Sequence, residues 1–168
     1  MKIILSEKLP RILKNKARLE KKLNIKISNR GKEIKIEGKP EEEYIAEKVI
    51  EALNFGFPFS VAILIKEEDL EFEMLNIKNY TSRKDLKSIR ARIIGKAGKT
   101  LKTLCQLTKC NFEIKENRVG IIGSAELIKN AQEAVISIVQ GAKQSNVYAH
   151  LEKNQLKPVV DLGLKEDF

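Results

Sequence analysis

The same series of secondary-structure elements occurs twice along the chain. In the first half, an apolar strand, KIIL, precedes a Lys-rich helical stretch, two alternating strands, NIKIS and EIKIEG, and a helix that begins at Pro40. In the second half, EFEMLNI, a basic helical stretch, NFEIK, RVGIIG and a helix that begins at Ser124 follow in the same order. Alternating apolar residues indicate strands, and apolar residues three or four positions apart indicate helices. The sequence therefore predicts two β-α-α-β-β-α units in tandem.

We expect an α+β fold, in which each unit is a three-stranded antiparallel sheet packed against three helices. The chain of 168 residues has room for two small domains of this kind. The repeat sets the expected boundaries: a first unit over 1–57, a connecting segment with a short helix over 58–70, a second unit over 71–142, and a C-terminal helix and tail over 143–168. We predict that three aromatic residues near the connection pack the two units together: Phe55, Phe57 and Phe59.

Positive charge is concentrated in one segment of the second unit. The chain has 32 Lys and Arg residues against 23 Asp and Glu, a formal net charge of +9. Residues 78–109 contain ten of the basic residues and one acid, Asp85, so the rest of the chain holds 22 of each sign. A patch of this kind is typical of proteins that bind polyanions such as nucleic acids. A solvated Lys-rich surface would give the same count, so the charge alone leaves both interpretations open.

The stretch RIIGKAGKT lies inside this basic segment and ends in Gly-Lys-Thr, as an ATP-binding P-loop does. A P-loop requires another glycine five residues before Gly98 and a buried strand before the loop. Position 93 is Ile, and the preceding segment is a basic amphipathic helix, because Leu86, Ile89 and Ile93 fall on one helical face. Both requirements fail, so the sequence excludes a P-loop.

A GxxG loop that joins two helices in a β-α-α-β-β-α unit is the arrangement of the type I KH domain, which clamps four nucleotides of a single strand. Glycines let the backbone approach a phosphate closely. The helix that follows presents its N-terminal N–H groups to the anion, and Lys96 and Lys99 add charge. The alternative is a capped helical turn that binds no ligand. The basic flanks and the repeat favour the KH interpretation.

The first unit has no such loop. Its equivalent turn falls near Leu13-Lys14-Asn15-Lys16, where no glycine occurs. We therefore expect the first unit to act mainly as a scaffold that packs on the second, although its Lys and Arg residues leave contact with an RNA backbone open.

The chain resembles the partner-of-Nob-one family of archaeal and eukaryotic KH proteins, which act in assembly of the small ribosomal subunit. The matching stretches are ARIIGKAGKTLKTLCQLTKCNFEI, VGIIGSAELIKNAQEAVISIVQGA and NVYAHL. A first unit with the KH order but without GxxG is similar to the archaeal branch. The resemblance implies an RNA-binding protein that grips single-stranded small-subunit rRNA near its 3′ end during maturation. It also implies two protein partners, a Nob-type endonuclease and the alpha subunit of translation initiation factor two.

The resemblance also implies which residues bind RNA. The loop and the start of the next helix would grip the backbone, and flanking helical residues would line the groove for the bases. Carried onto this sequence, the set is Arg92, Ile93, Gly95, Lys96, Ala97, Gly98, Lys99, Thr100, Lys102 and Leu104. Two other functions remain as alternatives: a protein adaptor that docks an endonuclease or initiation factor with RNA contact secondary, and a general KH regulator of other RNAs.

Catalytic and metal sites are not indicated by the sequence. No Ser/His/Asp set or general base stands out, so we expect neither an enzyme nor a cofactor. Cys105 and Cys110 would need two further ligands to bind zinc, and nothing places the only histidine, His150, beside them. We expect both cysteines to pack as small apolar residues.

The expected location is the cytoplasm, and the expected state is a monomer. No apolar run approaches the roughly 20 residues that span a bilayer. The apolar stretch in MKIILSEKLP is too short for the core of a signal peptide.

Overall fold

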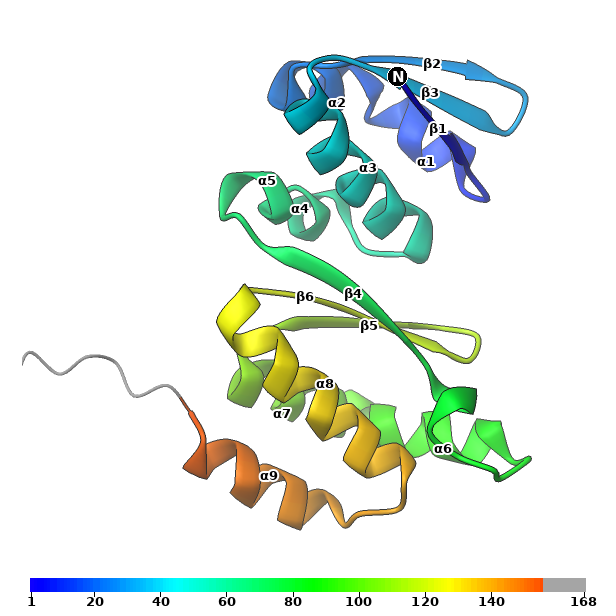
Figure 1. Cartoon of the computed structure of the whole chain (residues 1–168). Coiled ribbons are helices and arrows are strands. Elements are labelled where there is room, and N and C mark those ends of the chain that lie inside the picture. The colour runs from blue at the N-terminus through cyan, green and yellow to red at the C-terminus, as the bar shows by residue number, and fades with distance from the viewer. Residues whose placement is uncertain (156–168) are drawn as a thin grey trace, which may run out of the picture.

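Six strands form two separate antiparallel sheets in the computed structural model, which describes residues 1–155 (Figure 1). Sheet A has the order β1-β3-β2 and sheet B the order β4-β6-β5, so the last strand of each unit lies in the middle. The strands are β1 (Lys2–Leu5), β2 (Lys26–Arg30), β3 (Glu33–Glu37), β4 (Glu71–Asn76), β5 (Asn111–Lys115) and β6 (Arg118–Gly123). The predicted α+β class and the two three-stranded antiparallel sheets are confirmed.

Helices follow the strands in the same order in both halves. The first half contains α1 (Leu9–Lys14), α2 (Lys16–Leu23) and α3 (Pro40–Phe55), and the connection contains α4 (Phe59–Ala62) and α5 (Leu64–Glu67). The second half contains the 3₁₀ helix η1 (Ile77–Asn79), α6 (Leu86–Ile94), the 3₁₀ turn η2 (Lys96–Gly98), α7 (Lys99–Thr108), α8 (Ala125–Val139) and α9 (Gln144–Lys153). The expected C-terminal tail lies outside the described residues.

Local sequence explains where the elements lie. In β3, Ile34 and Ile36 are fully buried while Glu33 and Glu37 are exposed, which is the alternation of a half-buried strand. Helix α3 begins at Pro40, whose missing N–H would have no partner in the first turn. No helix among residues 1–155 is long and apolar enough to cross a membrane.

The two halves are joined through the outer face of sheet B. Phe72 of β4 and Ile122 of β6 belong to the core of the first half, where Phe55 and Phe57 are buried. The Phe72 ring centroid lies 5.9 Å from that of Phe55 and 5.8 Å from that of Phe57, both edge to face. The predicted packing role of Phe55 and Phe57 is therefore confirmed. Figure 1 shows the result, with α3 lying over sheet B and α8 on the opposite side of that sheet.

Phe59 differs from the other two aromatic residues. Its ring packs only at the margin of the first core, and the Arg18 guanidinium lies over it at 4.1 Å from the centroid. A polar contact also crosses the junction, because the Lys115 ammonium lies 2.6 Å from the Glu7 carboxylate.

Gly120, in the middle strand of sheet B, makes close packing of the aromatic residues possible. A Cβ at this position would lie 2.7 Å from Cε1 of Phe55 and 3.0 Å from Cε2 of Phe57. We expect Gly120→Ala to lower the free energy of unfolding by about 1–3 kcal/mol, the usual cost of overpacking. Urea unfolding followed by circular dichroism measures the change.

Lys35→Ala is the matched control, because Lys35 occupies the same place on β3, on the outer face of sheet A. The free energy of unfolding of this variant is expected to stay within about 0.5 kcal/mol of that of the original chain. Equal stability of the Gly120→Ala variant and the original chain would show that the halves do not pack as described.

Candidate nucleic-acid interface

The turn between α6 and α7 has a backbone that only glycine adopts easily. Gly95 has φ +77° and ψ 172°, in a region that is essentially restricted to glycine. Gly98 has φ +74°, and even Ala97 lies in the left-handed region, with φ +53°. A Cβ on Gly95 would overlap the Thr100 side chain and lie 2.7 Å from the Thr100 backbone nitrogen. The two glycines therefore allow a turn too tight for other residues.

The side chains of the turn separate into outward-facing and supporting groups. Lys96, Ala97, Lys99 and Lys102 are exposed, and Gly95 and Gly98 are half-buried. Thr100 is buried beneath Gly95. Helix α7 begins directly after Gly98, with neither an acidic residue in its first turn nor a side-chain cap. The Lys99 N–H is bonded to the Lys96 carbonyl. The uncapped start of α7 and the three exposed lysines still favour an anion at this turn.

A groove lies beside the turn, between α6 and the β5–β6 hairpin. Its volume is about 360 Å³. Ala91 and Ile94 of α6 and Ile114 of β5 give it an apolar floor. Lys87 and Arg90 add positive charge, and Glu116 adds one negative charge. Ile94, which is 37% exposed, directly precedes Gly95, so the groove is continuous with the turn.

Arg90 connects the two walls of this groove. Its Nη1 donates a hydrogen bond of 3.1 Å to the backbone carbonyl of Glu116, in the turn between β5 and β6. This contact holds the hairpin beside α6 and leaves the other donors of the guanidinium available.

Three residues that the resemblance placed in the groove have other roles. Ile93 and Leu104 are fully buried in the core of the second half, so their side chains do not line the groove. Arg92 donates hydrogen bonds to the carbonyls of Ile138, at 3.0 Å, and Ala142, at 2.6 Å. It holds the end of α8 against α6. The side chains of Ile93 and Leu104 thus lie in the core and that of Arg92 lies against the end of α8, and RNA contact by these three residues stays a prediction.

Several groove residues were not predicted from the sequence: Lys87, Arg90, Ala91, Ile94 and Ile114. One signal was available. Successive residues on a helix are about 100° apart, so Ile93 and Ile94 cannot both face the core. The apolar face through Ile89 and Ile93 already accounted for one of them, which leaves Ile94 for the surface.

The only acid of residues 78–109, Asp85, lies at the far end of α6 from the glycine turn. Its carboxylate caps the helix, accepting hydrogen bonds from the hydroxyl and the backbone N–H of Ser88 at 2.6 and 3.3 Å. These bonds lower the pKa of Asp85 below its usual value. Asp85 therefore stabilises α6 without placing negative charge at the turn.

The two cysteines are free thiols. Cys110 is buried, and burial raises its pKa to about 11, so it is protonated near neutral pH. Across the described part of the chain, no group of three or more His, Cys, Asp or Glu residues could hold a metal ion.

The turn between the first two helices of the first half does not have this geometry. Asn15 joins α1 to α2 with φ −102°, outside the left-handed region, and its side-chain amide donates to the Arg11 carbonyl at 2.9 Å. The turn is thus a capped junction between two helices, without a backbone that could close around a phosphate.

Known proteins share the fold of this site. A family model described as the eukaryotic-type KH domain (KH-domain type I), for the second KH domain of Pno1 proteins, matches residues 71–156. The chain belongs to this family. The match spans α6, the glycine turn, α7 and the groove, and it confirms the family resemblance.

Relatives and a solved structure extend the likeness. A KH domain-containing protein of Methanocaldococcus jannaschii is 29% identical over 67% of this chain and 50% of the relative. A pre-rRNA-processing protein pno1 of Emericella nidulans is 31% identical over 64% of this chain and 43% of the relative. The chain thus spans about half the length of these relatives. A crystal structure of an a/eIF2alpha–aDim2p–rRNA complex from Pyrococcus horikoshii has a similar fold, with a TM-score of 0.81, 22% identity and coverage of 90% of this chain and 92% of that one.

The two glycines of the turn are expected to differ in their tolerance of a side chain. Gly98→Ala meets no atom within 4 Å, so its cost is the left-handed backbone, about 1–2 kcal/mol. Gly95→Ala adds overlap with Thr100 to a backbone strain of about 1–3 kcal/mol, so it should destabilise more. Urea unfolding of the two single variants gives both values. A smaller loss for Gly95→Ala than for Gly98→Ala would contradict the described turn.

Proposed function

We propose that this chain is a non-catalytic RNA-binding protein that grips single-stranded small-subunit rRNA, near its 3′ end, during rRNA maturation. One observation carries the proposal: a glycine turn with three left-handed residues opens directly onto an apolar groove with basic residues. Membership of the KH family and the printed names of the relatives, which process pre-rRNA, support this choice of RNA.

The backbone of the RNA would lie against the glycine turn. A Cβ on Gly98 would stand in open space, so its absence lets a phosphate approach the backbone at the start of α7, while Gly95 gives the tight turn under which Thr100 packs. Lys96 and Lys99 are exposed on the same turn and attract the phosphate by charge. This part of the site binds any sequence, because phosphates are the same in every nucleotide.

The bases would enter the adjacent groove. A base has two apolar faces, and the exposed side chain of Ile94 and the neighbouring Ala91 and Ile114 offer a surface for one of them. Paired bases keep their faces stacked inside a duplex, so the groove favours an unpaired strand. The remaining donors of Arg90 are in place to hydrogen-bond base edges or phosphates.

For the first half, we propose a second KH unit that has lost its RNA-gripping turn. Its element order and its sheet order match those of the second half. We retain the unit boundaries 1–57 and 71–142, with residues 58–70 as the connection. In this arrangement the first unit supports sheet B, and the second unit holds the RNA.

We also propose the two protein partners that the family resemblance implies, a Nob-type endonuclease and the alpha subunit of translation initiation factor two. The Pyrococcus complex, whose title names an alpha subunit of that factor together with aDim2p and rRNA, supports the second.

Reversing the charge of the turn tests the proposed phosphate site. Lys96→Asp with Ala97→Asp keeps both glycines, and aspartate tolerates the left-handed backbone at position 97 better than alanine does. At an effective dielectric of ~20 and a separation of ~5 Å, each new repulsion with a phosphate is of order 3 kcal/mol before screening by salt. If a total repulsion of ~1.5 kcal/mol remains after screening, RNA binding would weaken more than tenfold. Fluorescence anisotropy with a labelled single-stranded RNA measures the affinity.

The control carries the same two substitutions in the first half, Lys14→Asp with Ala17→Asp. Both residues are exposed next to the α1–α2 junction, and the total charge change is identical. The affinity of this variant should stay close to that of the original chain. If both variants lose RNA equally, the site does not belong to the second half.

The neighbouring isoleucines Ile93 and Ile94 separate binding from stability. Ile94→Ala removes part of the groove floor and should weaken RNA binding roughly tenfold, with a change in stability within about 0.5 kcal/mol. Ile93→Ala should instead destabilise the fold by about 2–5 kcal/mol, because its side chain is fully buried. Anisotropy and urea unfolding measure the two effects. Unchanged RNA affinity of the Ile94→Ala variant would show that the bases do not bind in this groove.

A further inference from the structure

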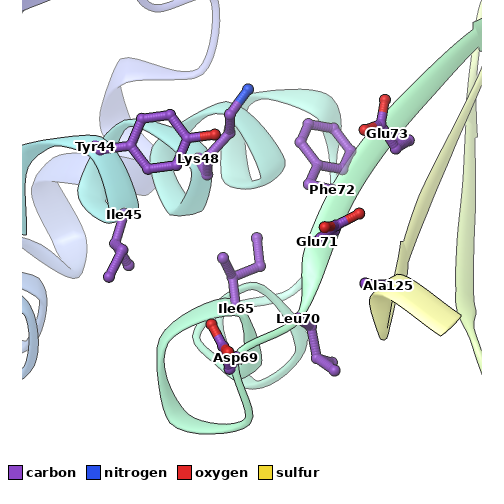
Figure 2. A pocket seen from close by; sticks show the side chains of 10 residues that line it. All are labelled: Tyr44, Ile45, Lys48, Ile65, Asp69, Leu70, Glu71, Phe72, Glu73 and Ala125. Atoms are coloured by element: carbon purple, nitrogen blue, oxygen red, sulfur yellow. The ribbon is translucent and has the colours of Figure 1, made fainter. Parts of the chain in front are cut away.

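A hollow of about 330 Å³ opens along strand β4, on the opposite edge of sheet B from the proposed RNA groove. Figure 2 shows its walls, with Tyr44 and Ile45 on α3, Ile65 on α5 and Ala125 at the start of α8. Strand β4 is an outer strand of the sheet, in the order β4-β6-β5. An outer strand has backbone N–H and C=O groups on its free side that no strand of the sheet pairs. The hollow therefore gives access to a free strand edge.

The side chains of β4 make the two sides of this edge different. Phe72 is buried against the first half, and Glu71 and Glu73 point to the opposite side and are exposed. The side of Phe72 also holds Ile65 and the exposed Tyr44. A strand laid beside β4 would place alternate residues on these two sides. One side would receive apolar residues and the other would receive cations.

Negative charge is locally unbalanced at this edge. The stretch EEDLEFE, residues 67–73, has five acids and no base, in a chain with a net charge of +9. Within residues 1–155, the only ion pair made by these five acids joins Glu67 to Lys22. Among the described residues that line the hollow, the one cation is Lys48, whose ammonium lies 3.7 Å from the Glu51 carboxylate. The carboxylates of Glu71 and Glu73 repel phosphates and attract Lys or Arg side chains.

We propose that the free edge of β4 binds an extended segment of another protein, which adds a fourth strand to sheet B and alternates Lys or Arg with apolar residues. Backbone hydrogen bonds to β4 would supply affinity, and the two unlike sides of the strand would select the sequence. The acids also prevent pairing with acidic or wholly apolar strands. RNA at the β5 edge and a protein strand at the β4 edge could then be bound together. The proposal extends the RNA-binding function and does not depend on it.

The test uses a fluorescein-labelled, end-blocked peptide of alternating Lys and Val as the probe. The full chain should bind it, and Glu71→Lys with Glu73→Lys should weaken binding at least about tenfold through like-charge repulsion. Glu71→Gln with Glu73→Gln, which only removes the charges, should give a smaller loss in the same direction. The matched control is Glu33→Lys with Glu37→Lys on β3, a strand paired on both sides by β1 and β2. This control variant should bind the peptide with an affinity within about twofold of that of the original chain.

Two N-methylated forms of the peptide separate strand pairing from simple charge attraction. An added strand turns alternate N–H groups toward β4, so methylation of one alternate set should abolish binding and methylation of the other should be tolerated. Tolerance of both forms, or equal losses in the β4 and β3 charge variants, would overturn the proposal. Light scattering gives a further test. If the chain alone is a dimer and the β4 charge variant is a monomer, the β4 edge binds a second copy of the chain, and the proposal is overturned. RNA affinity, measured in parallel, should change by a similar factor in the β4 and β3 Lys variants, because both carry the same added charge.

Discussion

The packing of Phe55 and Phe57 against the bare backbone of Gly120 determines how the two halves lie relative to each other. Because no side chain stands on β6 at that point, the rings come within van der Waals distance of the strand and meet Phe72 edge to face. Sheet B thereby gains a covered face on both sides, with α3 on one side and its own helices on the other. Its two outer strands, β4 and β5, are the parts of the sheet that remain accessible.

In the proposed function, the two halves of the chain have different tasks. One side of α3 packs against sheet A and the other against sheet B. This explains why the helix is buried along most of its length. Its turn at Asn15 is closed by an internal hydrogen bond. The second half keeps the open turn at Gly95, where Thr100 leaves no room for a side chain. In the proposed function, support is therefore provided by the first half and RNA binding by the second.

The sequence predicted most of this fold, because the relevant signals are local. Alternating isoleucines marked the strands, helical spacing marked α6 and α8, and the spacing of Gly95 and Gly98 marked the turn. The sequence prediction placed Ile93 in the groove and missed Ile94, although the helical face through Ile89 had already assigned Ile93 to the core. Nor could it show that Arg92 would bind the carbonyls of Ile138 and Ala142, since that contact joins residues 46 and 50 positions apart. Contacts across the fold, including Gly120 with Phe55, have no local pattern.

The account depends on RNA contact at the glycine turn and its groove, and nuclear magnetic resonance tests that contact most directly. Amide chemical shifts of the ¹⁵N-labelled chain would be followed during titration with a single-stranded oligoribonucleotide of small-subunit rRNA 3′-end sequence, and with the same sequence as a duplex. The account predicts that the single strand shifts Ile94 through Thr100 and the facing residues Ile114 and Glu116, whereas the duplex produces little change. Shifts centred on the α1–α2 junction of the first half, or equal shifts with both RNAs, would contradict it.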